Sequence, residues 1–375
     1  MIRFGPAGIP LSCKGRTLKD GIEDVHNLGL NAMEMQMVRV NMIKRYPDED
    51  EIGLTPLDVE GDLIMEILRD ESGEETLVTD LNEEIRDGDA LITLSSGLVQ
   101  NFHELRELGR MGRQLDVKLS MHTPYYMDLA SDSDLTGRSM DNIRWAGTMT
   151  HNMDGDIVVT HLGLYGKLSA KEAAENIMEN VGTLMDWWGE NGLEPFLGLE
   201  TSGRQEVFGS LDEILAIVDE IDKVVPVVNF AHLHARESGA LREPENFAEI
   251  IDRVRDISGD IQYTHFSGVE HEAGNEKRVT PIKKGDLRFE PLAEYLAESM
   301  PEITIISSSP LLEHDAMYMK VIFERVFNKK VIKQNRAKSL AMEEEPVDGE
   351  AKEEEKQRPE KKESRKKGGK KEAGK

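Results

Sequence analysis

Two kinds of hydrophobic pattern alternate along this chain. Short runs that are apolar throughout, or apolar at every second residue, are separated by longer stretches with apolar residues three or four positions apart. The first pattern is typical of β-strands and the second of helices. The strand-like runs begin near residues 2, 32, 116, 156, 195, 225, 261 and 303. Because strands that alternate with helices form parallel sheets, and eight such units can close on themselves, the sequence predicts an α/β fold, the (β/α)8 TIM barrel.

The alternation is interrupted once and ends before the C-terminus. Residues 46–97 are acidic and rich in turn-forming residues, with short strand-like runs near residues 63, 76 and 90. We therefore expect a small acidic β-rich insertion after the second strand, between a barrel start at 1–45 and the rest of the barrel at 98–335. Residues 336–375 hold few apolar residues and carry blocks of Glu followed by Lys and Arg. This composition cannot bury a core and predicts a disordered charged tail.

The net charge of the chain is strongly negative, at −26. From Ala341 to Lys375 there are 11 acidic and 11 basic residues, so the whole excess lies in the first 340 residues. Such a body repels nucleic acid unless a basic or metal-rich patch overrides the repulsion. We favour a solvated acidic surface, of the kind found in organisms with a salty cytoplasm, where salt screens the repulsion. The charge weighs against a DNA-binding function without excluding it.

The cysteine content and the length of the apolar runs indicate the compartment of the protein. A single cysteine, Cys13, excludes an internal disulfide and is typical of a reducing environment. No apolar run is as long as a membrane span, and Met1 leads directly into a strand-like run without the pattern of a signal peptide. The sequence therefore predicts a cytoplasmic location and no membrane partner.

Strand-like runs repeatedly end in a side chain that can bind a metal ion. Because the C-terminal ends of the strands of a barrel converge on one face, these side chains are expected to meet there. Two histidines and one glutamate with an open position form a catalytic ligand set for zinc. An ion held in this way lowers the pKa of bound water and polarises a phosphoryl or carbonyl oxygen, so hydrolysis and sugar isomerisation are both open. The residues at the strand ends are His122, His161, Glu200, His232 and His265.

Several motifs of the chain, taken together, resemble one family. They are HTPYYMDLAS, THLGLYG, GLETSGRQEVFGS, NFAHLHAR and THFSG. They are similar to motifs of the endonuclease IV family of metal-dependent DNA-repair nucleases, and of the wider group of xylose-isomerase-like barrels. The resemblance covers most of residues 1–330 apart from the insertion. It implies a (β/α)8 barrel with a three-zinc cluster that cleaves the phosphodiester 5′ to an abasic site.

The resemblance also implies a role for each of the metal-binding candidates. His122 and His161 would hold one ion, and Glu200 would bridge it to a second ion. His265 would belong to the second ion and His232 to the third.

Four positions depart from the ligand set of the family. Asn229 stands where the family has an Asp, and an amide is a much poorer zinc ligand than a carboxylate. An Asp and a His of the family fall on Lys277 and Val279, and a Glu falls on Ser308. We therefore expect one or two zinc ions rather than three, with Mn²⁺ as an alternative.

Four residues are candidates for binding the substrate, and Asn229 is one of them. Tyr125 matches a family position that inserts into the DNA at the lesion, with packing at the barrel mouth as the alternative. Arg204 would replace lost metal charge with a fixed cation at a phosphate. His234, two residues after His232 on a predicted strand, would point to the same side; a structural hydrogen bond is the alternative for it.

Three functions are compatible with these residues. The first is a metal-dependent phosphodiesterase of the endonuclease IV type, which cuts DNA 5′ to abasic sites in base excision repair. The second is a sugar isomerase or epimerase with a single metal, which needs an acid–base pair, whereas Glu200 is the one carboxylate placed at a predicted strand end. The third is a degenerate homologue that binds nucleic acid or a protein. The intact first ligand set favours the nuclease, with Glu200 as the catalytic residue and abasic DNA as the partner.

Overall fold

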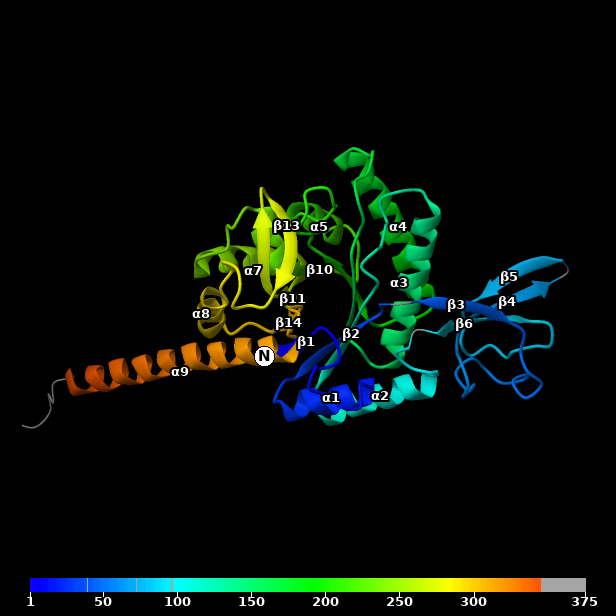
Figure 1. Cartoon of the computed structure of the whole chain (residues 1–375), viewed down its shortest axis with the longest axis horizontal. Coiled ribbons are helices and arrows are strands. Elements are labelled where there is room, and N and C mark those ends of the chain that lie inside the picture. The colour runs from blue at the N-terminus through cyan, green and yellow to red at the C-terminus, as the bar shows by residue number, and fades with distance from the viewer. Residues whose placement is uncertain (39, 72, 96, 345–375) are drawn as a thin grey trace, which may run out of the picture. The chain divides into compact units, whose positions relative to one another are not determined.

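Eight parallel strands form one sheet that curls into a barrel (Figure 1). The computed structural model describes residues 1–38, 40–71, 73–95 and 97–344. From β2 to β14 each barrel strand pairs with the next one along the chain, and β14 pairs with β1. The predicted TIM barrel is confirmed. Its strands are β1 (Ile2–Pro6), β2 (Ala32–Gln36), β7 (Lys118–His122), β8 (Ile157–Thr160), β9 (Phe196–Glu200), β10 (Val224–Asn229), β11 (Tyr263–Phe266) and β14 (Ile303–Ser307).

The barrel is nearly closed where β1 meets β2. A parallel bridge between Ala7 and Glu34 joins the two strands. A Cβ atom added at Gly5 would lie only 1.9 Å from the carbonyl oxygen of Ala32. Glycine is therefore required at this position for the strands to approach so closely.

The barrel strands are buried on both faces, as a parallel sheet enclosed by helices must be. Val159, Val227 and Ile306 belong to a cluster inside the barrel. Val158 and Ile305 belong to the larger core that includes the helices. Since side chains alternate along a strand, residues two positions after the inner ones face the C-terminal mouth of the barrel. These residues are His161, Asn229 and Ser308.

The helices that follow the strands begin where the sequence provides caps. The Thr17 side chain accepts a hydrogen bond from the backbone N–H of Asp20 at the start of α1, and Ser169 and Glu172 form a capping box at α4. Such caps satisfy backbone N–H groups that have no partner inside the helix. The helices before the C-terminal one are α1 (Leu18–Asn27), α2 (Phe102–Gln114), α3 (Asp134–Asn152), α4 (Ala170–Glu190), α5 (Leu211–Val218), α6 (Phe230–Arg236), α7 (Pro244–Ser258) and α8 (Glu290–Ser299).

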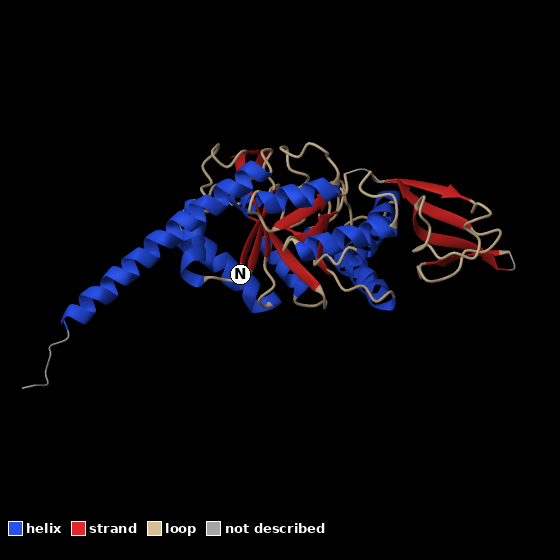
Figure 2. Ribbon diagram, turned by 90° about the horizontal axis from the view of Figure 1, so that it is seen from below, coloured by secondary structure: helices blue, strands red, loops and turns tan. Residues whose placement is uncertain are grey.

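The insertion after β2 is a separate antiparallel sheet (Figure 2). Its strands lie in the order β3 (Asn41–Arg45), β6 (Ala90–Ser95), β4 (Leu63–Glu71) and β5 (Glu74–Val78). A small core of its own includes Ile64, Ile67 and Leu91. We expected the insertion to begin at residue 46, but β3 already pairs with β6. The sheet therefore starts five residues earlier, at Asn41.

The basic residues of the insertion are all neutralised by neighbouring acids. Each of the four lies within 4.0 Å of a carboxylate. Since residues 41–95 contain no other Lys or Arg, this part of the chain offers no unpaired cation to a phosphate. The pairs are Lys44–Glu75, Arg45–Glu51, Arg69–Asp89 and Arg86–Glu83.

A β-hairpin that the sequence analysis did not predict follows β11. It consists of β12 (Gly268–Glu272) and β13 (Asn275–Thr280), which pair in antiparallel fashion. His271 lies on β12. Because the hairpin follows the C-terminal end of β11, it is connected to the face where the metal-binding candidates were expected.

The chain divides into two units, Met1–Lys330 and Val331–Lys375. The last helix, α9 (Glu313–Glu344), runs across this division. Residues 336–344 are thus helical, although we expected disorder from residue 336, because this stretch is made of good helix formers without Gly or Pro. The remainder of the predicted disordered tail, residues 345–375, lies outside the described residues. Among the helices that are described, none is long and apolar enough to cross a membrane.

Candidate metal centre

One cavity at the C-terminal mouth of the barrel gathers most of the predicted site residues. Its volume is about 260 Å³. Its lining comes from the C-terminal ends of the barrel strands, from the segments that follow them and from β13. The predicted residues that line it are His122, Tyr125, His161, Glu200, Asn229, His232 and His265.

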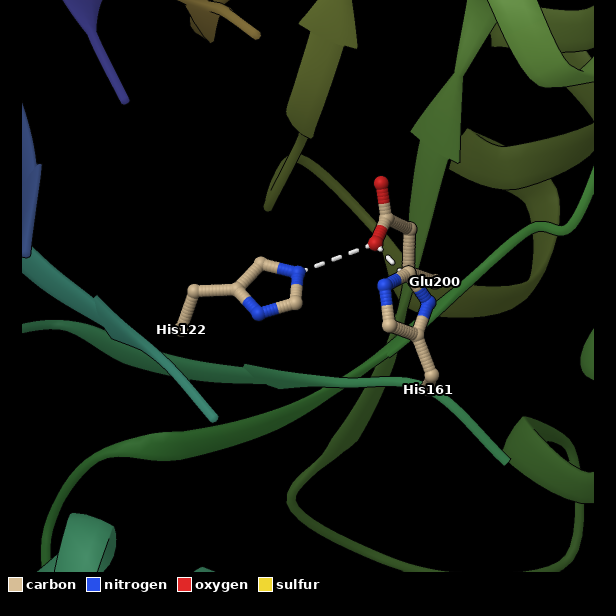
Figure 3. A group of neighbouring side chains, drawn as sticks. All are labelled: His122, His161 and Glu200. Atoms are coloured by element: carbon tan, nitrogen blue, oxygen red, sulfur yellow. Dashed lines mark hydrogen bonds and ion pairs between the residues drawn. The ribbon is translucent and has the colours of Figure 1, made fainter. Parts of the chain in front are cut away.

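The first ligand group consists of His122, His161 and Glu200. Both imidazole rings point at the same carboxylate oxygen (Figure 3). His122 Nε2 lies 3.0 Å from Glu200 Oε2, and His161 Nδ1 lies 3.2 Å from it. These separations are close to the roughly 3.3 Å between neighbouring ligands of a tetrahedral zinc ion with bonds of about 2.0 Å. The arrangement fits one divalent ion.

The hydrogen bonds of His122 support this fit. Its Nδ1–H donates to the carbonyl oxygen of Thr123 at 2.7 Å, which leaves Nε2 with a lone pair in the neutral ring. That lone pair faces an oxygen of Glu200, which is itself a lone-pair donor. Two such atoms attract one another only if a proton or a metal ion lies between them.

The protonation of this group is set by burial and by the charges around Glu200. Burial lowers the pKa of His161 to about 4, so the ring is neutral at pH 7 and can donate its lone pair. Burial alone would raise the pKa of Glu200, but His161 and His265 hold it well below its ordinary value. The group therefore combines the neutral imidazole of His161 with an ionised carboxylate. Burial opposes the charged form of His122, but Glu200 outweighs it and raises the pKa of His122, so a bound ion would displace a proton from its Nε2.

The other oxygen of Glu200 faces a second group. His265 Nδ1 lies 2.7 Å from Glu200 Oε1, and His265 Nε2 lies 2.8 Å from Glu34 Oε2. Burial opposes the charged form of His265, but Glu34 and Glu200 outweigh it and raise its pKa to about 10. Glu34 accepts the Nε2–H of the ring and leaves Nδ1 directed at Glu200. At pH 7 Nδ1 is protonated as well, so it would bind an ion only by releasing that proton.

Glu34 was not among the predicted site residues, and it is almost fully buried, with 1% of its surface exposed. Tyr263 O–H donates to Glu34 Oε2 at 2.9 Å, and Gln36 Nε2–H donates to Oε1 at 2.7 Å. Ser120 lies 2.6 Å from the Tyr263 hydroxyl. The sequence did carry a signal, because the inward-facing positions of β2 hold two polar residues, Glu34 and Gln36, where a barrel interior is usually apolar.

A third group lies between α6 and the hairpin. His232 Nδ1–H donates to the carbonyl oxygen of Thr201 at 2.6 Å, and its Nε2 lies 3.1 Å from Glu276 Oε2. As at His122, a lone pair faces a carboxylate oxygen. Glu276 on β13 was missed because its approach depends on the hairpin, which no sequence signal revealed. It stands beside Lys277, where the family pattern had suggested that a ligand was lost.

Asn229 supports the site without an oxygen free for an ion. Its Oδ1 accepts hydrogen bonds from the backbone N–H groups of Ala231 and His232, which caps α6. Its Nδ2–H donates to Glu200 Oε1 at 2.9 Å. The amide therefore orients Glu200 and the helix that carries His232.

Two predicted substrate-binding residues lie away from the cavity. His234 is on α6 rather than on a strand, so it cannot share a side with His232, because residues two apart on a helix point about 200° apart. Its Nε2–H donates to Asp286, which also lies 3.2 Å from His271, and its Nδ1 accepts from the backbone N–H of Leu241. The side chain of Arg204 is 54% exposed and forms an ion pair with Glu206 at 3.8 Å.

His234, His271 and Asp286 have ligand atoms close enough together to hold an ion. The hydrogen bond from Leu241 argues against this. A neutral imidazole that accepts at Nδ1 carries its proton at Nε2, and a protonated nitrogen cannot bind a metal. The group is a hydrogen-bonded link between α6 and the hairpin.

The remaining departures from the family pattern provide no ligand. Lys277 is exposed and pairs with Glu272 at 3.2 Å. Val279 and Ser308 line the cavity, but neither is a metal-binding side chain of the usual kind. Tyr125 stands at the cavity with 77% of its surface exposed and its ring edge-to-face with Tyr126.

Comparisons with known proteins agree with this architecture. The model of one protein family, the xylose isomerase-like TIM barrel, matches residues 93–308, more than half of the chain. The uncharacterized protein MJ0133 of Methanocaldococcus jannaschii is 28% identical over 221 residues, which make up 58% of this chain and 78% of that protein.

Solved structures of two kinds of enzyme share the fold. Endonuclease IV from Thermus thermophilus aligns with a TM-score of 0.55 and 13% identity, over 86% of this chain and 99% of that chain. D-Psicose 3-epimerase from Clostridium cellulolyticum, solved with D-tagatose, aligns with a TM-score of 0.51 and 12% identity, over 82% of this chain and 93% of that chain. At these identities the likeness concerns the fold alone.

Proposed function

Because the chain belongs to the xylose isomerase-like TIM barrel family, we propose that it is a metal-dependent phosphodiesterase of the endonuclease IV type. Its substrate in this proposal is duplex DNA with abasic sites, cut on the 5′ side of the lesion. Its ions are zinc, one or two per chain, since imidazole and carboxylate ligands suit this metal. Manganese is the alternative.

The observation that carries the proposal is the bridging position of Glu200. One of its oxygens faces His122 and His161, and the other faces His265. A carboxylate with both oxygens directed at separate histidine groups is suited to two ions held side by side. Paired ions stabilise both the attacking and the leaving oxygen of a phosphodiester.

In this proposal, neighbouring residues hold the candidate metal ligands in position. Divalent ions in the cavity would supply Lewis-acid chemistry and lower the pKa of bound water. Thr123 fixes the tautomer of His122, and Asn229 holds Glu200 in place. Glu34 fixes the ring of His265. These bonds keep the nitrogen lone pairs and carboxylate oxygens aimed at common points, which is the preorganisation that catalysis requires.

The cavity suits a small part of a DNA strand. Its volume of about 260 Å³ is slightly below the usual range of ligand pockets, which is about 300–1,000 Å³. It therefore suits a sugar without a base better than a complete nucleotide. Tyr125, exposed at the rim, would stack against the DNA beside the lesion.

The test is incision of a labelled duplex with one abasic site, together with the metal content of each chain. Glu200→Gln is expected to lose both incision and bound zinc. Glu206→Gln, at an exposed carboxylate nearby with 68% of its side chain accessible, is the matched control and should retain both. Normal incision by Glu200→Gln would refute the proposal.

A second candidate function has one observation in its favour. Glu34 provides a second buried carboxylate in the cavity, so the acid–base pair required by a sugar epimerase is available from Glu34 and Glu200. Conversion of a ketohexose by protein with a single ion per chain, without incision of abasic DNA, would establish this function instead.

A further inference from the structure

One hydroxyl on the wall of the cavity has no partner within the protein. Ser308 lines the cavity, and its Oγ is buried without a hydrogen-bond partner among the described residues. Six other buried side-chain atoms in the described part of the chain lack a partner as well, but none of their residues lines the cavity. Because buried polar groups are nearly always hydrogen-bonded, each exception calls for an explanation. For a residue on a cavity wall, a bound molecule can supply the partner.

The register of β14 directs Ser308 into the barrel mouth. Ile306, two residues earlier, belongs to the cluster inside the barrel. The backbone N–H of Ser308 donates to the carbonyl oxygen of Phe266 at 3.2 Å, so the ladder between β11 and β14 continues to this residue. Since side chains alternate along a strand, Ser308 faces inward like Ile306, whereas Ser307 faces the surrounding helices.

Ser308 stands across the barrel from the first ligand group. Going around the barrel in either direction, three strands separate β14 from β8. Ser308 therefore lies opposite His161, which directly follows β8. An ion held by His122, His161 and Glu200 would thus be on the far side of the cavity. A molecule that contacts both the ion and Ser308 has to span the mouth.

Apolar side chains form much of the remaining cavity wall. They come from β13 and from the segments that follow β1, β2 and β14: Ala7, Met37, Val38, Val279 and Leu312. Among the described residues, Ser308 is the one hydrogen-bonding side chain that β1, β14 and the segments after them bring to the cavity. A ligand at this wall meets apolar contacts and a single hydroxyl. This suits the carbon skeleton of a sugar with one oxygen directed at Ser308.

We propose that the hydroxyl of Ser308 binds one oxygen of the abasic sugar, an inference that rests on the proposed function. Ions at the first ligand group would take the phosphodiester, and Ser308 would hold the sugar at the opposite wall. A serine hydroxyl both donates and accepts hydrogen bonds, so a sugar hydroxyl or a ring oxygen suits it. Rotation about the Cα–Cβ bond turns Oγ toward the bound sugar. Ser308 thereby determines specificity, because it distinguishes a lesion that keeps its sugar from one that lacks it.

The experiment measures KM and kcat for incision of two duplexes by the full chain. One carries an abasic deoxyribose, and the other carries a propanediol spacer, which keeps the phosphodiester but has no sugar ring. Ser308→Ala is expected to raise KM for the abasic duplex roughly 3- to 10-fold, the effect of one neutral hydrogen bond, with kcat and zinc content unchanged. For the spacer duplex, the variant and the unaltered chain should have the same KM, because no sugar oxygen is left to bind.

Ser307→Ala is the matched control. It removes a hydroxyl that is also buried and without a partner among the described residues, from the same strand but from the face turned away from the cavity. KM should stay unchanged for both duplexes. Since neither substitution breaks a side-chain hydrogen bond of the described structure, the melting temperatures of both variants should equal or exceed that of the unaltered chain.

Three results would overturn the inference and leave the proposed function standing: an unchanged KM of Ser308→Ala for the abasic duplex, an equal rise of KM in Ser307→Ala, or an equal rise for the spacer duplex. If the unaltered chain cuts neither duplex, the proposed function fails and the inference fails with it. The behaviour of the unaltered chain therefore separates the failure of the function from the failure of the inference alone.

Discussion

Glu34 and His265 are hydrogen-bonded across the barrel, with Oε2 and Nε2 2.8 Å apart, although 231 residues separate them in the chain. The other nitrogen of the same ring faces Glu200 at 2.7 Å. The orientation of His265 toward the candidate metal centre therefore depends on a residue in the middle of the second strand. Tyr263 and Gln36 donate hydrogen bonds to the carboxylate of Glu34 and fix its position.

We expect Glu34→Gln to weaken one ion selectively. Loss of the carboxylate removes the group that fixes the ring of His265, and outer-shell changes of this kind typically lower metal affinity about 10- to 100-fold. Isothermal titration with zinc should then show a weaker second site and a nearly unchanged first site, because His122 and His161 pair with Glu200 rather than with Glu34. Equal weakening of both sites, or of neither, would contradict the assignment of Glu34 as a positioning residue.

We expect His232 and Glu276 to act as a pair. Their facing atoms are 3.1 Å apart, so removal of either partner should release the same ion or proton. His232→Ala and Glu276→Ala are expected to lower bound metal to the same level, and the double variant should lower it no further. Additive losses in metal content would mean that the two residues serve separate sites.

We expect Gly5→Ala to destabilise the barrel by more than about 2 kcal/mol, because the added Cβ would meet the backbone carbonyl of Ala32, which cannot move aside. Gly137→Ala is the control, since a Cβ there meets nothing within 4 Å and the residue lies in α3. That change should stabilise the chain by about 0.5–1 kcal/mol. Chemical denaturation of both variants gives the two free energies. Equal stability of the two would disprove the role of Gly5 at the seam.

We expect Glu66→Gln to change how stability varies with pH. Glu66 lies where the insertion meets α3, 3.4 Å from Arg144, and burial raises its pKa despite that cation. The folded chain thus holds the proton more tightly than the unfolded chain, so the stability contributed by this group is present in acid and is lost as pH rises through the raised pKa. Melting temperatures of the variant and the unaltered chain should diverge in favour of the variant as the pH rises from about 4 to about 8. Parallel curves would show that Glu66 titrates normally.

The local hydrophobic pattern was sufficient to predict most of the strands of this protein. The eight barrel strands and the three short strands near residues 63, 76 and 90 could be predicted because alternation and apolar runs report on burial within a few residues. His122, His161 and Glu200 could be predicted to meet because the fold itself brings strand ends together. The first ligand group could therefore be predicted from the sequence alone.

Only the tertiary structure decided the rest of the site. Glu276 reaches His232 through a hairpin, His234 turns away because its segment is a helix, and Glu34 meets His265 because the barrel brings β2 and β11 to opposite sides of one interior. Each of these outcomes depends on contacts between segments far apart in the chain. The hydrophobic pattern specifies which face of a strand is buried, but not which polar group from another strand will lie opposite, and that pairing determines the chemistry of the centre.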